Sequence, residues 1–124
     1  MESIKDLEGK ILTEIITSED NIIFVCDDKS RYQMCHIQKC CELVVVEDIC
    51  GDLQDLIGVP ILEAREDTSK ENPEGIRKED QNSFTWTFYN LRTIKGSVTI
   101  RWYGDSNGYY SESVNFERVD RRGR

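Results

Sequence analysis

Two runs of alternating apolar and polar residues, Ser83 to Tyr89 and Ser97 to Tyr103, constrain the fold of this 124-residue chain more than any other feature. Side chains of a strand point to opposite faces at period 2, so each run predicts a strand with one apolar and one polar face. We expect the two apolar faces to pack together in the core of an antiparallel sheet. The apolar residues of the two runs are Phe84, Trp86, Phe88, Val98, Ile100 and Trp102.

A turn and a third run follow these strands. Asn107 and Gly108 tolerate positive φ and therefore suit a turn after the second strand. Val114 and Phe116 lie at alternate positions and predict a further strand. Together the three runs predict an antiparallel meander that holds most of the chain's aromatic residues.

The first half of the chain predicts a second meander. Strands are expected over 10–18, 22–26 and 31–37, separated by short turns, and further strands at 43–46 and 61–65. The spacing of the apolar residues in the first segment, Ile11, Leu12, Ile15 and Ile16, also fits a helix. We favour a strand because its threonines lower helix propensity, the run is short, and residues 18–21 close it like a hairpin turn.

One short helix is expected between the last two of these strands. Asp52 suits the N-cap position, and Gly58 ends the pattern. The apolar residues of the helix, at i, i+3 and i+4, are Leu53, Leu56 and Ile57. We therefore predict a single domain over 1–124 of the α+β class. It is β-dominated, with antiparallel meanders around one short central helix.

Acidic residues are concentrated in the middle of the chain. The net charge is −8, and the window from Glu42 to Asp80 holds twelve acids and four bases, which accounts for the whole excess. Phosphate contacts need clustered Lys and Arg, so we expect no direct binding to nucleic acid. The window is either a solvated surface that keeps the protein soluble or an acidic patch that engages a basic partner. Its later part, 66–82, is polar and predicts a long exposed loop.

The N-terminus and the cysteines predict a cytoplasmic protein with reduced thiols. The first residues contain neither an apolar signal core nor a basic leader, and no run approaches the roughly 18 apolar residues of a membrane span. The five cysteines, between Cys26 and Cys50, lack the spacing of a disulfide framework. We expect them to be reduced and mostly buried, with no disulfide.

The densest candidate for a metal or catalytic site is the cluster of Cys35, His36, Cys40, Cys41 and Glu42. Thiolate and imidazole are the usual zinc ligands, but the cluster has no CxxC pair, and adjacent cysteines in an extended chain point in different directions. We expect no metal, no cofactor and no catalytic residues. A small metal-dependent enzyme built on His36 stays an alternative.

The polar face of the main meander is the candidate ligand site. If the apolar faces are buried, the polar residues emerge together, and a tyrosine beyond the turn returns beside Tyr103. Aromatic rings, hydroxyls and an arginine can stack a base and pair with a phosphate, which favours a small nucleotide. The alternative is that Thr and Tyr are simply good strand formers. The expected face carries Thr85, Thr87, Tyr89, Thr99, Arg101 and Tyr103. The predicted ligand-binding residues are Arg101, Tyr103, Tyr109, Tyr110, Thr99, Tyr89 and Arg92, with Arg65 as a further helper.

Two stretches of the sequence resemble a group of small uncharacterised proteins. They run through residues 40–58, with the motif Ile49-Cys50-Gly51-Asp52-Leu53, and through residues 95–112, with KGSVTIRWYG and SNGYYSE. The resembling proteins are encoded by bacteriophages and their bacterial hosts and form a domain of unknown function. The similarity covers roughly Ile4 to Val119 and carries no activity to individual residues. It implies a context in which small acidic proteins often counter host defence.

We therefore predict a non-enzymatic accessory protein of a phage or mobile element, of the counter-defence type, which sequesters a small nucleotide signal in the host cytoplasm. The first alternative is an acidic inhibitor that occupies a basic surface of a host defence protein. The second is the metal-dependent enzyme. No membrane partner is expected, and a homo-oligomer is compatible with the sequence.

Overall fold

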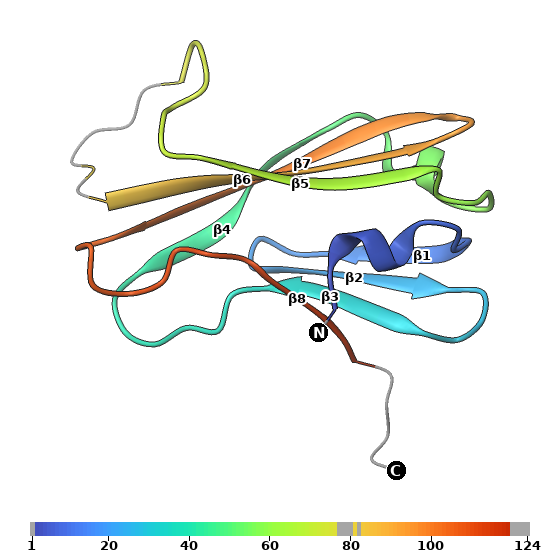
Figure 1. The fold of residues 1–124 in the computed structure, drawn as a ribbon, viewed down its shortest axis with the longest axis horizontal. Helices are drawn as coiled ribbons and strands as arrows, with labels where there is room; N and C mark the ends of the chain where they lie inside the picture. The colour runs from blue at the N-terminus through green and yellow to red at the C-terminus, as the bar shows by residue number, and fades with distance from the viewer. Residues whose placement is uncertain (1, 77–80, 82, 120–124) are drawn as a thin grey trace.

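The computed structural model describes residues 2–76, 81 and 83–119, which form two four-stranded antiparallel sheets stacked as two layers (Figure 1). The first sheet contains, in spatial order, β1 (Leu12–Thr17), β2 (Asn21–Cys26), β3 (Arg31–Cys35) and β8 (Asn115–Arg118). The second contains β4 (Leu43–Cys50), β7 (Gly96–Ser106), β6 (Ser83–Thr93) and β5 (Glu63–Ser69). The prediction of a β-dominated antiparallel fold is confirmed.

The N-terminal strands form the predicted meander, but the C-terminal strand joins a different sheet from the one expected. β1, β2 and β3 pair in sequence order, and β8 then pairs with β3, so that Phe116 lies opposite Met34. We expected β8 beside β7. That prediction is wrong because the second edge of β7 is taken by β4, which brings Val46 opposite Trp102. The segment 107–114 therefore passes from the upper layer to the lower one (Figure 1).

The predicted helix is a single 3-10 turn. In the described part of the chain the helical elements are η1 (Ile4–Leu7) and η2 (Leu53–Leu56). Asp52 does cap η2, because its carboxylate accepts the N–H of Gln54 at 3.0 Å. Leu56 is fully buried, so packing holds the segment, but so short a segment has too few hydrogen bonds to propagate an α-helix.

The polar stretch 66–82 is only partly a loop. β5 continues well into it, and Glu66 lies opposite Tyr89, because the edge of β6 offers main-chain groups that need partners. The prediction of a free loop is therefore wrong for the part that pairs with β6. Within this stretch, residues 77–80 and 82 lie outside the described residues.

The register of β6 and β7 corrects the predicted face of β6. Directly opposed residues of an antiparallel pair share a face, and Leu91 lies opposite Val98 whereas Trp86 lies opposite Tyr103. The face toward the first sheet carries Thr85, Thr87, Tyr89, Leu91, Val98, Ile100 and Trp102. The residues that we expected on that face, and that lie on the outer face, are Phe84, Trp86 and Phe88.

The prediction of the core is correct in part, because five of its eleven residues are buried: Leu56, Trp86, Val98, Ile100 and Trp102. Trp86 and Trp102 are both fully buried, as expected, but on opposite faces of the sheet. Trp102 belongs to the core between the sheets, together with Phe24 and Met34 of the first sheet. The predicted core residues that are only partly buried are Phe84, Phe88, Val114, Phe116, Leu53 and Ile57.

A second aromatic cluster on the outer face of the sheet explains the burial of Trp86. Its ring contacts Tyr103 edge to face, with centroids 5.0 Å apart. Two residues that follow β5 bind these rings: Asn72 accepts the indole N–H of Trp86 at 3.0 Å, and Gln81 donates to the Tyr103 hydroxyl at 2.7 Å. Asn72 and Gln81 also exchange two amide hydrogen bonds, of 3.0 and 3.2 Å.

Candidate functional site

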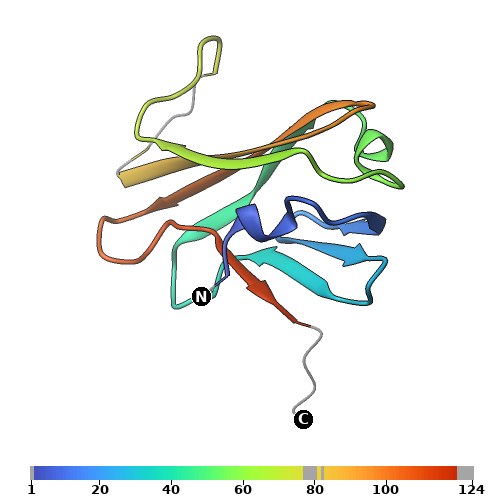
Figure 2. The same ribbon diagram turned by 45° about the vertical axis from the view of Figure 1, so that its right-hand side comes forward.

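A cleft lies at the end of the molecule where the second sheet projects beyond the first. The start of β6 and the end of β7 extend past the lower layer, and the chain folds back beneath them before it enters β8 (Figure 2). The cleft has a volume of about 420 Å³. Its lining consists of Glu66, Thr68, Lys70, Ser83, Thr85, Thr87, Gly108, Tyr110, Ser111, Glu112 and Ser113.

The floor of the cleft is the polar half of the inner face of β5 and β6. Thr85 and Thr87 alternate with the outer aromatic residues and continue the same face as Tyr89, which is fully buried in the core. The opposite wall is the segment 108–113, which we call the rim segment. The hydroxyl-rich run that we expected on an outer surface therefore faces inward, into a cleft.

Glu112 anchors the rim segment to the second sheet. Its carboxylate accepts the hydroxyls of Thr85 at 2.8 Å and Ser106 at 2.6 Å, and the ammonium group of Lys70 lies 3.8 Å away. Burial by itself would raise the pKa of Glu112. The hydrogen bonds from Ser106, Ser83 and Thr85 and the charge of Lys70 outweigh it and hold the pKa below its ordinary value. The cleft therefore contains an ionised carboxylate.

Gly104 allows the rim segment to lie directly against β7. A Cβ atom at this position would lie 2.7 Å from the main-chain oxygen of Glu112 and 3.2 Å from Cγ2 of Val44. Both distances are shorter than normal van der Waals contacts, so a side chain here would push the rim segment away.

The charge of the cleft is predominantly negative. Surrounding protein and the neighbouring Asp67 raise the pKa of Glu66, although part of this side chain contacts solvent. Lys70 supplies the positive charge among the lining residues, and its side chain is 74% exposed, so water screens it. The cleft is therefore better suited to an uncharged or cationic ligand than to an anion.

Two buried donors lie at the boundary between the cleft and the core. Trp102 is opposite Thr87, and Tyr89 lies two residues along the same face. The Tyr89 hydroxyl and the Trp102 indole nitrogen are both buried and have no hydrogen-bond partner among the described residues. Buried polar atoms without a partner are uncommon in proteins, and they add to the polar character of this end of the sheet.

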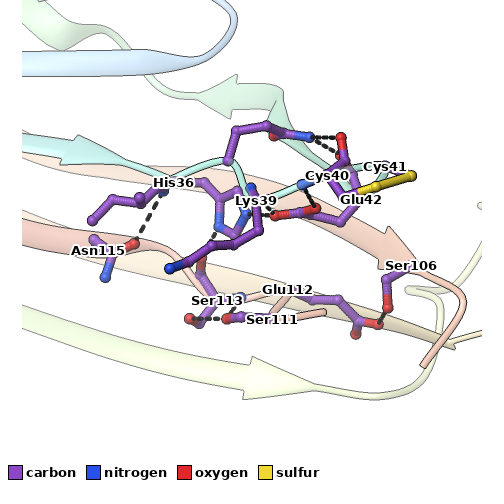
Figure 3. Close-up of polar contacts among 12 residues, drawn as sticks. His36, Lys39, Cys40, Cys41, Glu42, Ser106, Ser111, Glu112, Ser113 and Asn115 are labelled. Atoms are coloured by element: carbon purple, nitrogen blue, oxygen red, sulfur yellow. Dashed lines mark hydrogen bonds and ion pairs between the residues drawn. A yellow bond between two sulfur atoms is a disulfide. The ribbon is translucent and has the colours of Figure 1, made fainter. Parts of the chain in front are cut away.

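His36 connects the rim segment to the end of β3 (Figure 3). Its Nδ1 lies 2.8 Å from the main-chain oxygen of Ser113, and its Nε2 lies 2.7 Å from Oε2 of Glu42. The Glu42 carboxylate also accepts the main-chain N–H groups of Lys39 at 2.8 Å and Cys40 at 2.9 Å. The hydrogen bond from His36 contributes most to a pKa of about 2 for Glu42, against the opposing effect of burial.

A family model described as a domain of unknown function, DUF7448, matches residues 5–116. The chain belongs to the DUF7448 family. This confirms the resemblance to an uncharacterised family that the two motif stretches indicated. Neither a search of curated proteins nor a search of solved structures finds a match.

This DUF7448 member differs from expectation at the cysteines. Cys40 and Cys41 form a disulfide, whereas we predicted reduced thiols (Figure 3). Adjacent side chains point apart in an extended strand. These two cysteines lie in the connection between β3 and β4 instead, where their sulfur atoms can meet. Cys26, Cys35 and Cys50 are free thiols, and burial raises the pKa of Cys26 and Cys35. Within the described residues, no group of three or more His, Cys, Asp or Glu side chains could hold a metal ion.

The structure does not bring the predicted ligand-binding residues together on one face. Arg101 and Tyr103 lie on the outer face, where Arg101 makes a bidentate pair with Asp48, one bond measuring 2.6 Å, and stacks 5.9 Å from the Trp86 ring. The Arg101 guanidinium also holds the pKa of Asp48 below its ordinary value. Tyr103 is 2% exposed. Tyr89 lies on the opposite face and is fully buried.

Of the other predicted residues of the DUF7448 chain, two line a second pocket. Thr99 and Arg92 line a smaller pocket of about 200 Å³ on the outer face, together with Arg65. Both arginines lie near the carboxylate of Glu63, at 3.3 Å for Arg92 and 3.8 Å for Arg65.

The two tyrosines that follow β7, Tyr109 and Tyr110, lie in different environments. Tyr110 lines the cleft, whereas Tyr109 is 83% exposed and contacts the Tyr110 ring edge to face. The prediction that one of them returns beside Tyr103 is wrong, because the rim segment folds under the inner face and Tyr103 lies on the outer one.

Sequence reasoning missed Glu112 and the serines of the rim segment. The loop between β6 and β7 is formed by Ile94 and Lys95, and it fixes Thr93 opposite Gly96. Extending that register places Thr87 opposite Trp102, and so assigns the threonine face of β6 to the interior. Buried threonines need a polar partner, and this was the available signal for a carboxylate beneath them.

Proposed function

We propose that this chain is a non-enzymatic binding protein that takes a small polar ligand in the cleft between the start of β6 and the rim segment. The observation that carries the proposal is a cleft of about 420 Å³ in which an ionised, buried Glu112 is surrounded by hydroxyl groups. Its volume lies within the usual range for small-molecule sites, roughly 300–1,000 Å³.

The lining favours a ligand that is rich in hydroxyl groups and has one flat face. Thr68, Ser83 and Ser111 can exchange hydrogen bonds with hydroxyls, and carboxylates accept them. The Tyr110 ring offers a surface for the apolar face of a sugar or for a base. Saccharides and nucleosides combine these features.

A nucleotide, the ligand that the sequence predicts, fits the cleft through its sugar and base. Its phosphates would lie near Glu66 and Glu112, with Lys70 as the positive charge among the lining residues. We therefore expect nucleosides and neutral sugars to bind more tightly than the corresponding phosphates. In biological terms, we propose that a phage or mobile element uses this protein to sequester such a ligand in the host cytoplasm and so counters host defence.

Inhibition of a basic host protein is the second candidate. Glu66, Asp67, Glu71 and Glu74 are exposed and close in sequence, which supports an acidic contact surface. Other acids of the predicted window are engaged within the protein: Glu42 with His36, Asp48 with Arg101 and Glu63 with Arg92. The metal-dependent enzyme has less support, because His36 already uses both ring nitrogens in hydrogen bonds.

Isothermal titration with a panel of neutral sugars, nucleosides, nucleotides and polyamines tests the proposal. Tyr110→Ala should weaken binding of a responding compound about tenfold, since stacking on an aromatic ring contributes about 1–3 kcal/mol. Tyr109→Ala is the matched control, because this ring is adjacent, exposed and outside the cleft. The proposal fails if no compound binds, or if both variants lose binding equally.

A further inference from the structure

The imidazole of His36 lies between two hydrogen-bond acceptors at the end of the cleft. We infer that His36, in its doubly protonated form, latches the rim segment to the first sheet and so regulates access to the cleft. We call His36, Glu42 and the main-chain oxygen of Ser113 the latch. The inference rests on the proposed function for its biological meaning, since it concerns the same cleft, but the latch can be measured without a ligand.

Hydrogen-bond accounting assigns the two protons. The main-chain oxygen of Ser113 can only accept, and an ionised carboxylate can only accept. A neutral imidazole has one N–H and one lone pair, so it satisfies one of these partners and turns a lone pair toward the other. The imidazolium donates at both Nδ1 and Nε2, which matches the contacts of 2.8 Å and 2.7 Å.

The alternative, a neutral His36 that accepts a hydrogen bond from a protonated Glu42, conflicts with the surroundings of the carboxylate. Oε2 of Glu42 already accepts the N–H of Lys39, and Oε1 accepts the N–H of Cys40. These donors stabilise the ionised form, in agreement with a pKa of about 2 for Glu42. Glu42 is therefore an acceptor at neutral pH.

The charged groups around His36 support the same assignment. In the connection between β3 and β4, Glu42 is its direct partner, and both side chains are almost completely buried, at 4% and 0% exposed. The rim segment presents the Ser113 carbonyl, while the adjacent Glu112 carboxylate turns to Thr85 and Ser106 of the second sheet. The ring therefore faces two acceptors, a buried carboxylate and a main-chain oxygen.

The latch gives the rim segment an anchor on each sheet. Glu112 fixes it to β6 and β7, and His36 fixes the next residue, Ser113, to the end of β3 (Figure 3). Loss of one proton from the ring removes one donor, so either the Ser113 contact or the Glu42 contact is lost.

Nitrogen NMR of the side chain tests the latch directly, because His36 is the single histidine of the chain. At pH 6.5, both ring nitrogens of the folded protein should carry protons, as the two contacts require. A neutral tautomer in the folded protein, with one bare nitrogen, would overturn the inference.

Amide exchange of the rim segment tests the consequence. In His36→Phe, exchange at residues 111–113 should be at least tenfold faster, while exchange in β1 and β2 stays unchanged. Lys39→Ala is the matched control, because its exposed side chain is replaced while its main-chain N–H to Glu42 remains. Equal exchange in the two variants would overturn the latch.

In His36→Phe, accelerated exchange confined to the rim segment supports the latch, and uniform behaviour along the chain contradicts it. If this variant does not fold, the ring-nitrogen measurement on the wild-type protein decides the inference by itself. Proton-bearing nitrogens without any cleft ligand would leave the latch standing and the proposed function refuted. Ligand binding with a neutral His36 would refute the latch and leave the proposed function standing.

Discussion

The two halves of the inner face of β6 differ in environment although they follow the same alternation. Tyr89 and Leu91 belong to the core and are opposed by strands of the first sheet. Thr85 and Thr87 continue the same face, but the rim segment 108–113 lies opposite them. Residue type follows the opposing element: apolar side chains meet the sheet, and hydroxyls meet the irregular segment.

This comparison shows that alternation defines which residues share a face but not which face is buried. Thr87 is as inaccessible to water as Leu91, each at 1% exposed. What separates the two is the chemistry of their partners, since the cleft end contains an ionised carboxylate and the core end contains aliphatic and aromatic groups. A buried polar half within an otherwise apolar strand face is therefore a useful indicator of a polar cleft.

Truncation of a side chain in the core between the sheets should have the largest effect. Trp102→Ala removes a fully buried indole from the core and should cost about 3–5 kcal/mol of unfolding free energy, a large part of the stability of a domain of this size. Urea unfolding followed by circular dichroism measures this loss. A cost below about 1 kcal/mol would show that the two ends are not distinguished by packing.

Removal of the charge at the cleft end should have an intermediate effect. Glu112→Gln leaves the hydroxyls of Thr85 and Ser106 with a weaker acceptor and should destabilise the protein by about 1–3 kcal/mol at pH 7. Glu117→Gln, on the exposed side of β8, is the control and should change stability by less than about 0.5 kcal/mol. Equal effects of the two substitutions would contradict the structural role of Glu112.

The effect of Glu112→Gln should also depend on pH. The pKa of Glu112 is lower in the folded protein than its ordinary value, so its contribution is complete above the unfolded pKa of about 4.3. It is lost as the pH falls through the folded pKa. Unfolding curves of the wild type and the variant should therefore converge in acid, and a constant difference down to pH 2 would refute the assignment.

The outer face should respond least. Arg101→Ala breaks a partly exposed pair with Asp48 and a contact with Trp86, which together predict a loss of about 0.5–1 kcal/mol. Because Arg101 lies on the face opposite the cleft, binding of any cleft ligand should be unchanged in isothermal titration. Loss of binding in this variant would return the ligand site to the outer face.

The sequence predicted the elements of the second sheet better than their orientation. The period-2 pattern located β6 and β7, and both tryptophans are buried as expected. The alternation of Ser83 to Tyr89 alone does not show which of its two faces is buried. Leu91 has the parity of Tyr89, and only the register with Val98 shows that this parity faces the core.

Other differences depend on contacts between distant segments, which local patterns do not contain. Whether Phe116 joins β7 or β3 depends on β4 occupying the edge of β7. The capping residue Asp52 and the buried Leu56 were correct, but the short span between them leaves a 3-10 turn instead of a helix. The cleft itself could not be predicted, because it arises where one sheet projects beyond the other.

The pairing of β8 with β3 also has a consequence for how the chain is made. Tyr32 lies opposite Arg118, so the first sheet joins residues that are far apart in the sequence. Contacts of such large sequence separation form slowly, because the intervening chain must first be ordered. During synthesis the β1–β3 meander emerges before β8, and its β3 edge stays unpaired until Asn115–Arg118 has been translated. We expect a nascent chain truncated before Asn115 to expose that edge, which makes it the most aggregation-prone stage in the biogenesis of this protein.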